Sequence, residues 1–477
     1  MSDSLKQKTK KGVIWSTVER FSVQGVQFIV MIVMARLLTP HDYGIIGMLA
    51  IFLAIAQSLI DSGFSQALIR KTDRTETDNS TVFYFNLVVS GLLYLILFLS
   101  APLVAKFYHT PELCPVMRVV CLGIIFNSLA VVQRALLTVN IDFKTQAKAS
   151  LSAAVMSGVI GITLAYHGAG VWALVVQQLV NLGVNTGLLW VLSSWRPKRV
   201  FSWQSFHELF AFGSKLLVSG LIYTIYQNLY TLVIGKLFAP SKLGHYTRAQ
   251  QFSSFPSSNL TGVIQRVTYP VLCEIRNDEE HLKSVYRRFL KISAFIVFPL
   301  MVGLSAVSAP LVHVILGSKW DYCAQLLQIL CFAMMWYPIH AINLNLLEVK
   351  GRSDLFLRLE IIKEILGVVI LCATAPFGLL VMCYGQILSS ILSLTINTYY
   401  TGKLIGLGFI KQMRDLLPTL VLCLAMYILI VIINHFVTGN VAQLIMDVIV
   451  GALFYLSISR ILHFSELKSV FSLIKRK

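Results

Sequence analysis

Long apolar stretches alternate with short polar joints along this chain of 477 residues. A helix that crosses a bilayer needs about 20 mainly apolar residues, and fourteen stretches approach that length. The joints contain charged residues together with proline and glycine, which end helices. The pattern predicts an all-α, polytopic membrane protein of about fourteen transmembrane helices. The predicted helices cover residues 12–38, 44–60, 81–104, 115–137, 150–166, 170–192, 212–237, 245–267, 290–316, 322–347, 355–375, 378–400, 416–437 and 441–461.

Composition supports the same class of protein. Hydrophobic residues make up 56% of the chain and charged residues only 13%, whereas soluble domains are about 45–50% apolar and about 25% charged. The eight cysteines are scattered without Cys-x-x-Cys spacing, which favours free thiols in apolar surroundings over a metal site. We therefore expect neither a bound metal nor another cofactor.

The basic residues predict an orientation. If the N-terminus is cytoplasmic, 32 of the 40 Lys and Arg residues fall on the cytoplasmic side and seven on the outer side, with Arg20 inside the first helix. Cytoplasmic loops of membrane proteins carry this excess of positive charge. The count predicts that both termini are cytoplasmic, and it explains the net charge of +18 without a nucleic-acid partner.

Two similar segments, 200 residues apart, predict a repeat. "ARLLTPHDYG" begins at Ala35 and "GKLFAPSKLG" begins at Gly235, each at the joint between two apolar stretches. A second pair, at Gly170 and Gly378, has Gln eight residues after the glycine in both copies. Six helices per copy make both halves enter the membrane from the same side, as parallel repeats do. We expect an N-lobe of residues 1–204, a C-lobe of residues 205–408, and two further helices in residues 409–477.

Polar residues inside three predicted helices indicate a water-filled cavity between the lobes, because polar side chains are costly in hydrocarbon. Arginine pairs with phosphate oxygens, and aromatic and amide groups suit sugar rings. The alternative for the basic residues is that they snorkel to the membrane surface. The candidate substrate-binding residues are Arg20, Gln24, Lys215, Tyr223, Gln227, Tyr230, Arg248, Gln251, Asn259 and Arg266.

Four acidic residues are candidates for ion coupling, because carboxylates within membrane helices can carry protons or sodium. They are Glu19, Asp61, Glu360 and Glu364. The alternative for Glu360 and Glu364 is an ion-pair cluster with Arg358 and Lys363. For Asp61 it is a helix cap or an ion pair.

Several quoted segments resemble one family. They are "ARLLTPHDYGIIGM" from Ala35, "DSGFSQALIR" from Asp61, "FYHTPEL" from Phe107, "GVWALVVQQL" from Gly170, "LGHYTRAQQF" from Leu243, "QRVTYPVL" from Gln265 and "LGSKW" from Leu316. In order and spacing they are similar to the bacterial polysaccharide transporter family of Wzx-type flippases. Within it they resemble the WzxC-like, colanic-acid-exporter-like branch of the multidrug/oligosaccharidyl-lipid/polysaccharide (MOP) exporter superfamily.

The resemblance implies a MATE-like fold and a function. Such proteins flip an undecaprenyl-diphosphate-linked oligosaccharide across the bacterial inner membrane by alternating access, for lipopolysaccharide O-antigen, capsule or exopolysaccharide biosynthesis. The resemblance also implies coupling to a proton or sodium gradient and contact with polysaccharide polymerase machinery. In related flippases cationic residues of helices 1, 2, 7 and 8 line the cavity, and Arg20 and Arg248 fit that description best. Helix 2 departs from it, since its span holds no Arg or Lys.

Two other functions stay open from the sequence. A drug or cation antiporter of the same superfamily would need an acidic cavity, whereas helices 1, 7 and 8 are basic. A membrane glycosyltransferase or polymerase that uses the same lipid carrier would need acidic residues on sizeable outer loops, and these loops are short. The chain also lacks a Gly-rich phosphate loop, His-Glu-x-x-His and Gly-x-Ser-x-Gly. We therefore expect a transporter and not an enzyme.

Overall fold

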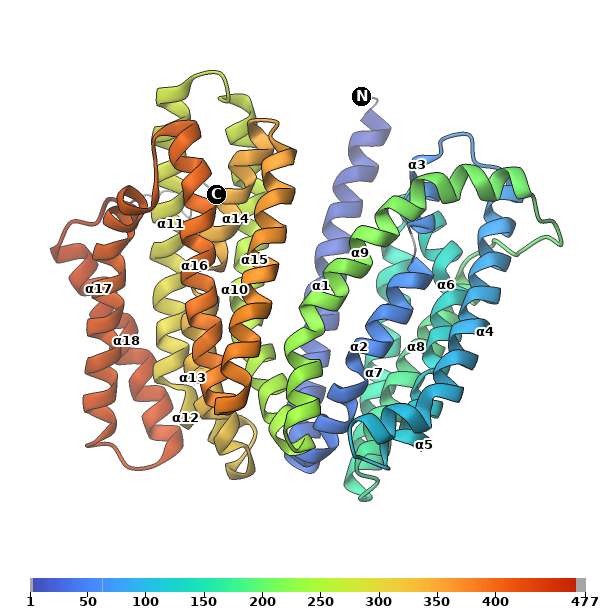
Figure 1. The fold of residues 1–477 in the computed structure, drawn as a ribbon, viewed down its shortest axis with the longest axis horizontal. Coiled ribbons are helices and arrows are strands. Elements are labelled where there is room, and N and C mark those ends of the chain that lie inside the picture. Colours follow the sequence, from blue (N-terminus) through green and yellow to red (C-terminus); the bar gives the residue numbers. More distant parts are fainter. Residues whose placement is uncertain (1–2, 62, 469–477) are drawn as a thin grey trace. The chain divides into compact units, whose positions relative to one another are not determined.

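The computed structural model describes residues 3–61 and 63–468, and this part of the chain is helical without strands (Figure 1). The chain divides into two compact units, residues 1–244 and 245–477. The first unit contains α1 (Asp3–Leu37), α2 (Pro40–Asp61), α3 (Phe64–Arg70), α4 (Glu76–Phe107), α5 (Leu113–Val120), α6 (Leu122–Val139), α7 (Phe143–Tyr166), α8 (Val171–Leu192) and α9 (Trp203–Leu237).

The tenth helix, α10 (Pro240–Glu274), begins in the first unit and continues into the second. The second unit also contains α11 (Glu279–Ala306), α12 (Ser308–Ile315), α13 (Asp321–Met334), α14 (Tyr337–Val349), α15 (Ser353–Thr374), α16 (Leu379–Ile405), α17 (Phe409–Asn434) and α18 (Asn440–Ile461). Short 3-10 turns, η1 (Ser318–Trp320) and η2 (Ala375–Phe377), precede α13 and α16.

Twelve helical segments of the described chain are long and apolar enough to cross a membrane. The predicted spans 245–267 and 355–375 do form helices, α10 and α15, but neither is among these twelve segments. Both carry several charged or polar side chains within the span. The chain is thus an all-α, multi-pass membrane protein, and the count of about fourteen spans stays a prediction.

The boundary between the two compact units differs from the boundaries expected for the repeats. Helix α9, the first helix of the expected C-lobe, packs on α2, α3 and α4 inside the first unit. Helices α17 and α18, expected as an appendage, pack on each other and on α11 and α12 in the second unit (Figure 1). Packing contacts and repeated order are different properties of a chain, so the lobe boundaries at residues 204 and 408 stay predictions.

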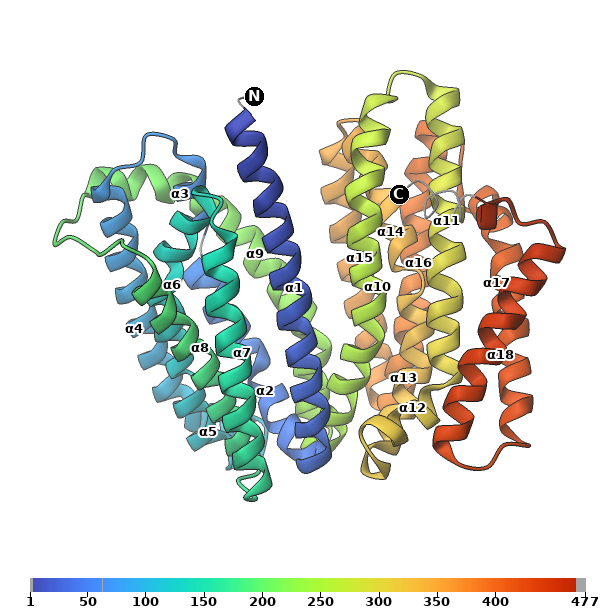
Figure 2. The ribbon, with the colours of Figure 1, turned by 180° about the vertical axis from the view of Figure 1, so that it is seen from behind.

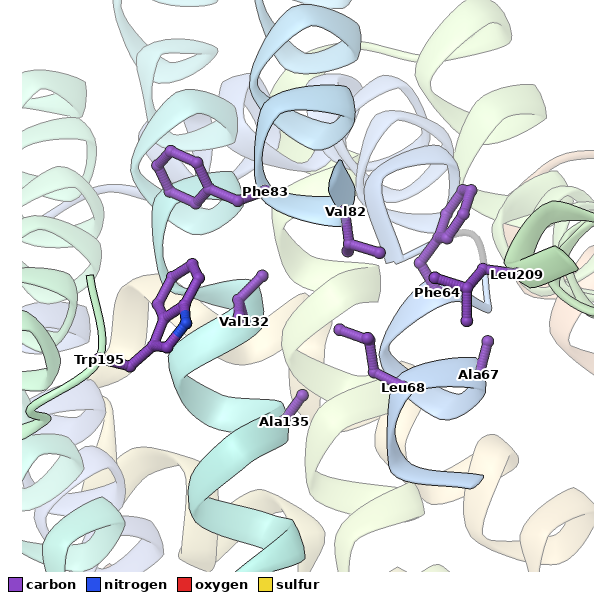
Figure 3. Close-up of a cluster of buried hydrophobic side chains, with 9 residues drawn as sticks. All are labelled: Phe64, Ala67, Leu68, Val82, Phe83, Val132, Ala135, Trp195 and Leu209. Atoms are coloured by element: carbon purple, nitrogen blue, oxygen red, sulfur yellow. The ribbon is translucent and has the colours of Figure 1, made fainter. Parts of the chain in front are cut away.

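An aromatic and aliphatic cluster ties one end of the first unit together (Figure 3). It joins α3, α4, α6, the α8–α9 connection and the first turns of α9. Its fully or nearly buried members are Phe64, Ala67, Leu68, Val82, Phe83, Val132, Ala135, Trp195 and Leu209. Because α9 carries four of the candidate site residues, this cluster sets where that helix starts.

Polar contacts reinforce the same end of the unit. The indole N–H of Trp195 donates to Glu76 Oε2 at 2.9 Å. The ammonium of Lys71 bridges Asp78 Oδ1 at 3.1 Å and Glu208 Oε2 at 3.0 Å, which links the start of α4 to α9. Burial lowers the pKa of Lys71, but the hydrogen bonds to Glu208 and Asp78 outweigh it and raise the pKa above its ordinary value.

The two copies of the repeated joint contact each other. A Cβ added at Gly44 would lie 1.8 Å from the carbonyl oxygen of Pro240, and one added at Gly244 would lie 1.8 Å from the carbonyl oxygen of Pro40. The first turns of α2 and α10 therefore cross in backbone contact, each glycine against the proline of the other copy. Only glycine permits so close an approach, which explains why both copies end in Pro-x-x-apolar-Gly.

Candidate functional site

On α1 the two charged candidates face different surroundings. This helix packs along α7 (Figure 2), and Glu19 Oε1 accepts a hydrogen bond from the Ser150 hydroxyl of α7 at 3.0 Å. The partner that the structure gives Glu19 is thus a hydroxyl. Arg20 is exposed, and Gln24, one helical turn later, is partly buried. Arg20 and Gln24 share one face of α1.

On α9 three candidates form one stripe. The helix is continuous from Trp203 to Leu237, so Tyr223, Gln227 and Tyr230, at i, i+4 and i+7, lie on one face. Tyr223 is 60% exposed within the structure, Gln227 is exposed, and Tyr230 is partly buried. The side chains of two further candidates, Lys215 and Asp61, lie outside the described residues.

Helix α10 has two polar faces with different roles. One face is buried inside the second unit and consists largely of hydroxyl side chains. Ser257 Oγ donates to the Met334 carbonyl at 2.7 Å, and Gln386 Nε2 donates to the Tyr246 hydroxyl at 2.8 Å. Small hydroxyl residues let membrane helices approach closely and bond across the interface. Part of the polarity of α10 therefore serves packing rather than a cavity.

The other face of α10 carries the candidate residues. Arg248 Nη1 donates to Gln251 Oε1 at 2.6 Å, one turn along the helix. Gln251 and Arg266 are exposed, and Asn259 is partly buried and donates to the Phe255 carbonyl at 2.8 Å. This stripe of guanidinium and amide groups can bind anionic and sugar oxygens. The sequence placed all of these residues on one polar helix, but only the packing separates them from the buried hydroxyl face.

On α15 one of the two acidic candidates forms an ion pair. Glu360 forms an ion pair with Lys363, three residues along the helix, which is the alternative that the sequence left open. Glu364 is partly buried one turn further on. Among the described residues, no group of three His, Cys, Asp or Glu side chains could hold a metal ion.

Sequence reasoning missed a polar network inside the second unit. His340 of α14 bonds through Nε2 to Ser390 Oγ and through Nδ1 to Asn397 Nδ2 of α16, both at 3.1 Å. A further set joins Asn343, Thr401 and Gln412 of α14, α16 and α17 at 2.8–3.1 Å. These are single polar residues within apolar stretches, and a sequence carries no signal for which of them meet.

The chain matches a family described as "Polysaccharide biosynthesis protein" over residues 33–325, more than half of its length. The chain belongs to this family. It is 24% identical to the teichuronic acid biosynthesis protein TuaB of Bacillus subtilis (strain 168), over 95% of each chain. It is 25% identical to the lipopolysaccharide biosynthesis protein WzxC of Escherichia coli (strain K12), over 90% of this chain and 89% of that one.

Solved structures establish the fold of this polysaccharide biosynthesis protein. It resembles the lipid II flippase MurJ in an inward closed conformation with a TM-score of 0.76 and 15% identity, over 94% of this chain and 99% of that one. It also resembles an inward-facing MATE family transporter of the MOP superfamily with a TM-score of 0.62 and 17% identity, over 82% and 98% of the two chains. The expected MATE-like fold and family are confirmed.

Proposed function

We propose that this protein flips an oligosaccharide linked to a polyprenyl diphosphate across the membrane, for the synthesis of a cell-surface polysaccharide. The observation that carries the proposal is similarity over nearly the whole chain to proteins of polysaccharide biosynthesis, on the fold of a lipid II flippase. The protein is a transporter and not an enzyme. The natural pathway is lipopolysaccharide O-antigen, capsule or exopolysaccharide biosynthesis.

The polar faces of α1, α9 and α10 are the proposed substrate-binding surfaces. Arg20 on α1, and Arg248 and Arg266 on α10, supply positive charge for the diphosphate. The stripe of Tyr223 and Gln227 on α9 supplies aromatic and amide groups for the sugars. Arg20 and the α9 stripe belong to the first compact unit, and Arg248 and Arg266 belong to the second.

The setting and the energy source belong to the same proposal. The membrane is the bacterial inner membrane, both termini are cytoplasmic, and the polymerase machinery receives the flipped substrate. A proton or sodium gradient drives the cycle. Among the coupling candidates, Glu364 is favoured over Glu360, because Glu360 is engaged by Lys363.

Transport of cationic drugs is a weaker candidate. MATE family transporters share the fold, but a fold does not determine the substrate. The described candidate residues of α1, α9 and α10 include three arginines and no carboxylate other than Glu19, which accepts a hydrogen bond from Ser150. Such faces attract anions rather than cations.

The test combines a deletion with point variants. A cell without the protein should accumulate lipid-linked repeat units on the cytoplasmic leaflet, and the wild-type protein should restore polymer export. Arg248→Ala should lower polymer export at least tenfold at equal protein level. Arg248→Lys should support only part of the wild-type export, because lysine keeps the charge but lacks the fork of donors. Lys242→Ala removes an exposed charge from the same helix and is the matched control. Accumulation on the outer leaflet would instead indicate a polymerase.

A further inference from the structure

A cavity of about 610 Å³ lies beside the first turns of α11, and none of the candidate residues of α1, α9 and α10 lines it. Its lining consists of the start of α11 and of residues 465 and 466, which follow α18. Four of the lining residues are basic, namely Lys283, Arg287, Arg288 and Lys291. They follow one another at i, i+4, i+5 and i+8, which gathers them on one side of the helix.

One of these arginines is held in a fixed orientation. Arg287 donates through Nε to Asp415 Oδ2 at 2.7 Å and through Nη2 to Asp415 Oδ1 at 2.6 Å. Asp415, on α17, is only 7% exposed, whereas Arg287 is 45% exposed. A guanidinium has five N–H donors, so this fork uses two and leaves three for another partner. The ammonium of Lys291 lies 3.7 Å from the same carboxylate.

The position along α11 places the cavity at the membrane surface. Lys291 is the last charged residue of the helix, and residues 292–306 contain no charged side chain. A helix rises about 1.5 Å per residue, so Lys283 lies about 12 Å from Lys291 along the axis, outside the uncharged segment. The headgroup layer adds about 5–8 Å on each side of the hydrocarbon, so Arg287 and Arg288, about 5–6 Å beyond Lys291, lie at headgroup depth and Lys283 lies just outside it.

The charges in the cavity favour an anion. Four cations face three carboxylates, Glu280 and Glu466 in the lining and Asp415, which pairs with Arg287 and Lys291, so the excess charge is positive. Glu280 is almost fully exposed and lies 3.7 Å from Lys283, a geometry that contributes little in water. Like charges one helical turn apart repel, so a bound anion would relieve the repulsion within this group. The hydroxyls of Ser284 and Ser465 add neutral donors to the lining.

We propose that this cavity binds the phosphate group of an anionic amphiphile of the membrane. Basic pockets at the ends of transmembrane helices bind such headgroups, and arginine with lysine suits phosphate oxygens. Two molecules offer this chemistry, an anionic phospholipid and a polyprenyl diphosphate. The site would keep an anionic lipid at α11 and α17, or hold the diphosphate of a lipid carrier at the membrane surface.

The experiment measures lipid binding by the full chain in detergent, independently of transport. Native mass spectrometry would compare the wild type with Lys283→Gln/Arg288→Gln, which leaves the Arg287–Asp415 pair intact. The matched control is Lys198→Gln/Arg199→Gln, which removes two exposed charges from the α8–α9 connection. The probes are dioleoyl phosphatidylglycerol, dioleoyl phosphatidylcholine and farnesyl diphosphate.

We expect the wild type and the control to bind phosphatidylglycerol over phosphatidylcholine, and the cavity variant to bind phosphatidylglycerol at least tenfold more weakly. If farnesyl diphosphate binds more tightly than phosphatidylglycerol, and only the cavity variant loses this binding, the lipid carrier is identified as the source of the phosphate. Equal binding of both anions by all three proteins would overturn the proposal. If the double variant is not monodisperse, the single variant Lys283→Gln takes its place in the test, and we expect it to bind phosphatidylglycerol about threefold more weakly than the wild type. Normal polymer export by a variant that has lost lipid binding leaves the proposed function intact.

Discussion

The contact between the two repeated joints makes a sharp prediction about Gly44. An ordinary contact between carbon and a carbonyl oxygen is about 3.3–3.6 Å, and the Cβ of Gly44→Ala would lie 1.8 Å from the Pro240 oxygen. The added methyl group is therefore about 1.5 Å too close to a backbone atom, which cannot rotate away as a side chain can. Overpacking of this kind costs about 1–3 kcal/mol, and we expect the upper end because backbone lies on both sides. Gly244→Ala should behave in the same way, since the contact is reciprocal.

The matched control is Gly91→Ala in α4, where an added Cβ meets nothing within 4 Å. Alanine is favoured over glycine inside a helix by about 0.5–1 kcal/mol, so this variant should be neutral or slightly stabilised. Thermal unfolding of the purified proteins in one detergent measures the difference, with Gly44→Ala melting well below the wild type and Gly91→Ala at or above it. If Gly44→Ala and Gly244→Ala have the same melting temperature as Gly91→Ala, the two joints do not touch as described. The explanation of the repeated glycine would then be wrong.

Two further predictions concern the second unit. Asp415→Ala should lower the free energy of unfolding by about 1–2 kcal/mol. Arg287 then loses both of its hydrogen bonds to a nearly buried carboxylate, while the exposed part of its side chain stays hydrated. An unchanged melting temperature would show that the pair contributes nothing to stability. Ser257→Ala should cost about 1 kcal/mol, because the Met334 carbonyl loses its donor. The neighbouring exposed Ser258→Ala is the control, and equal effects of the two serine variants would contradict the separation of the α10 faces.

Much of this protein was predictable from its sequence. Apolar stretches of bilayer length force a helix, because the backbone in hydrocarbon must satisfy its own hydrogen bonds. The all-α membrane class, most helix positions and the family follow from that pattern and from the quoted segments. The similarity of residues 35–44 and 235–244 was also visible, and it indicated that these joints are equivalent.

The tertiary structure decided which side of each helix packs and what each polar group meets. The sequence showed that α10 is polar, but only packing separates Ser257, bonded to Met334, from the face of Arg248 and Gln251. It showed Glu19 inside a helix, but not its bond to Ser150. The physical reason is that lipid is as apolar as a leucine side chain, so a membrane helix can be apolar on every side. Which sides meet depends on close fit and on bonds between helices, and these join residues far apart in the chain.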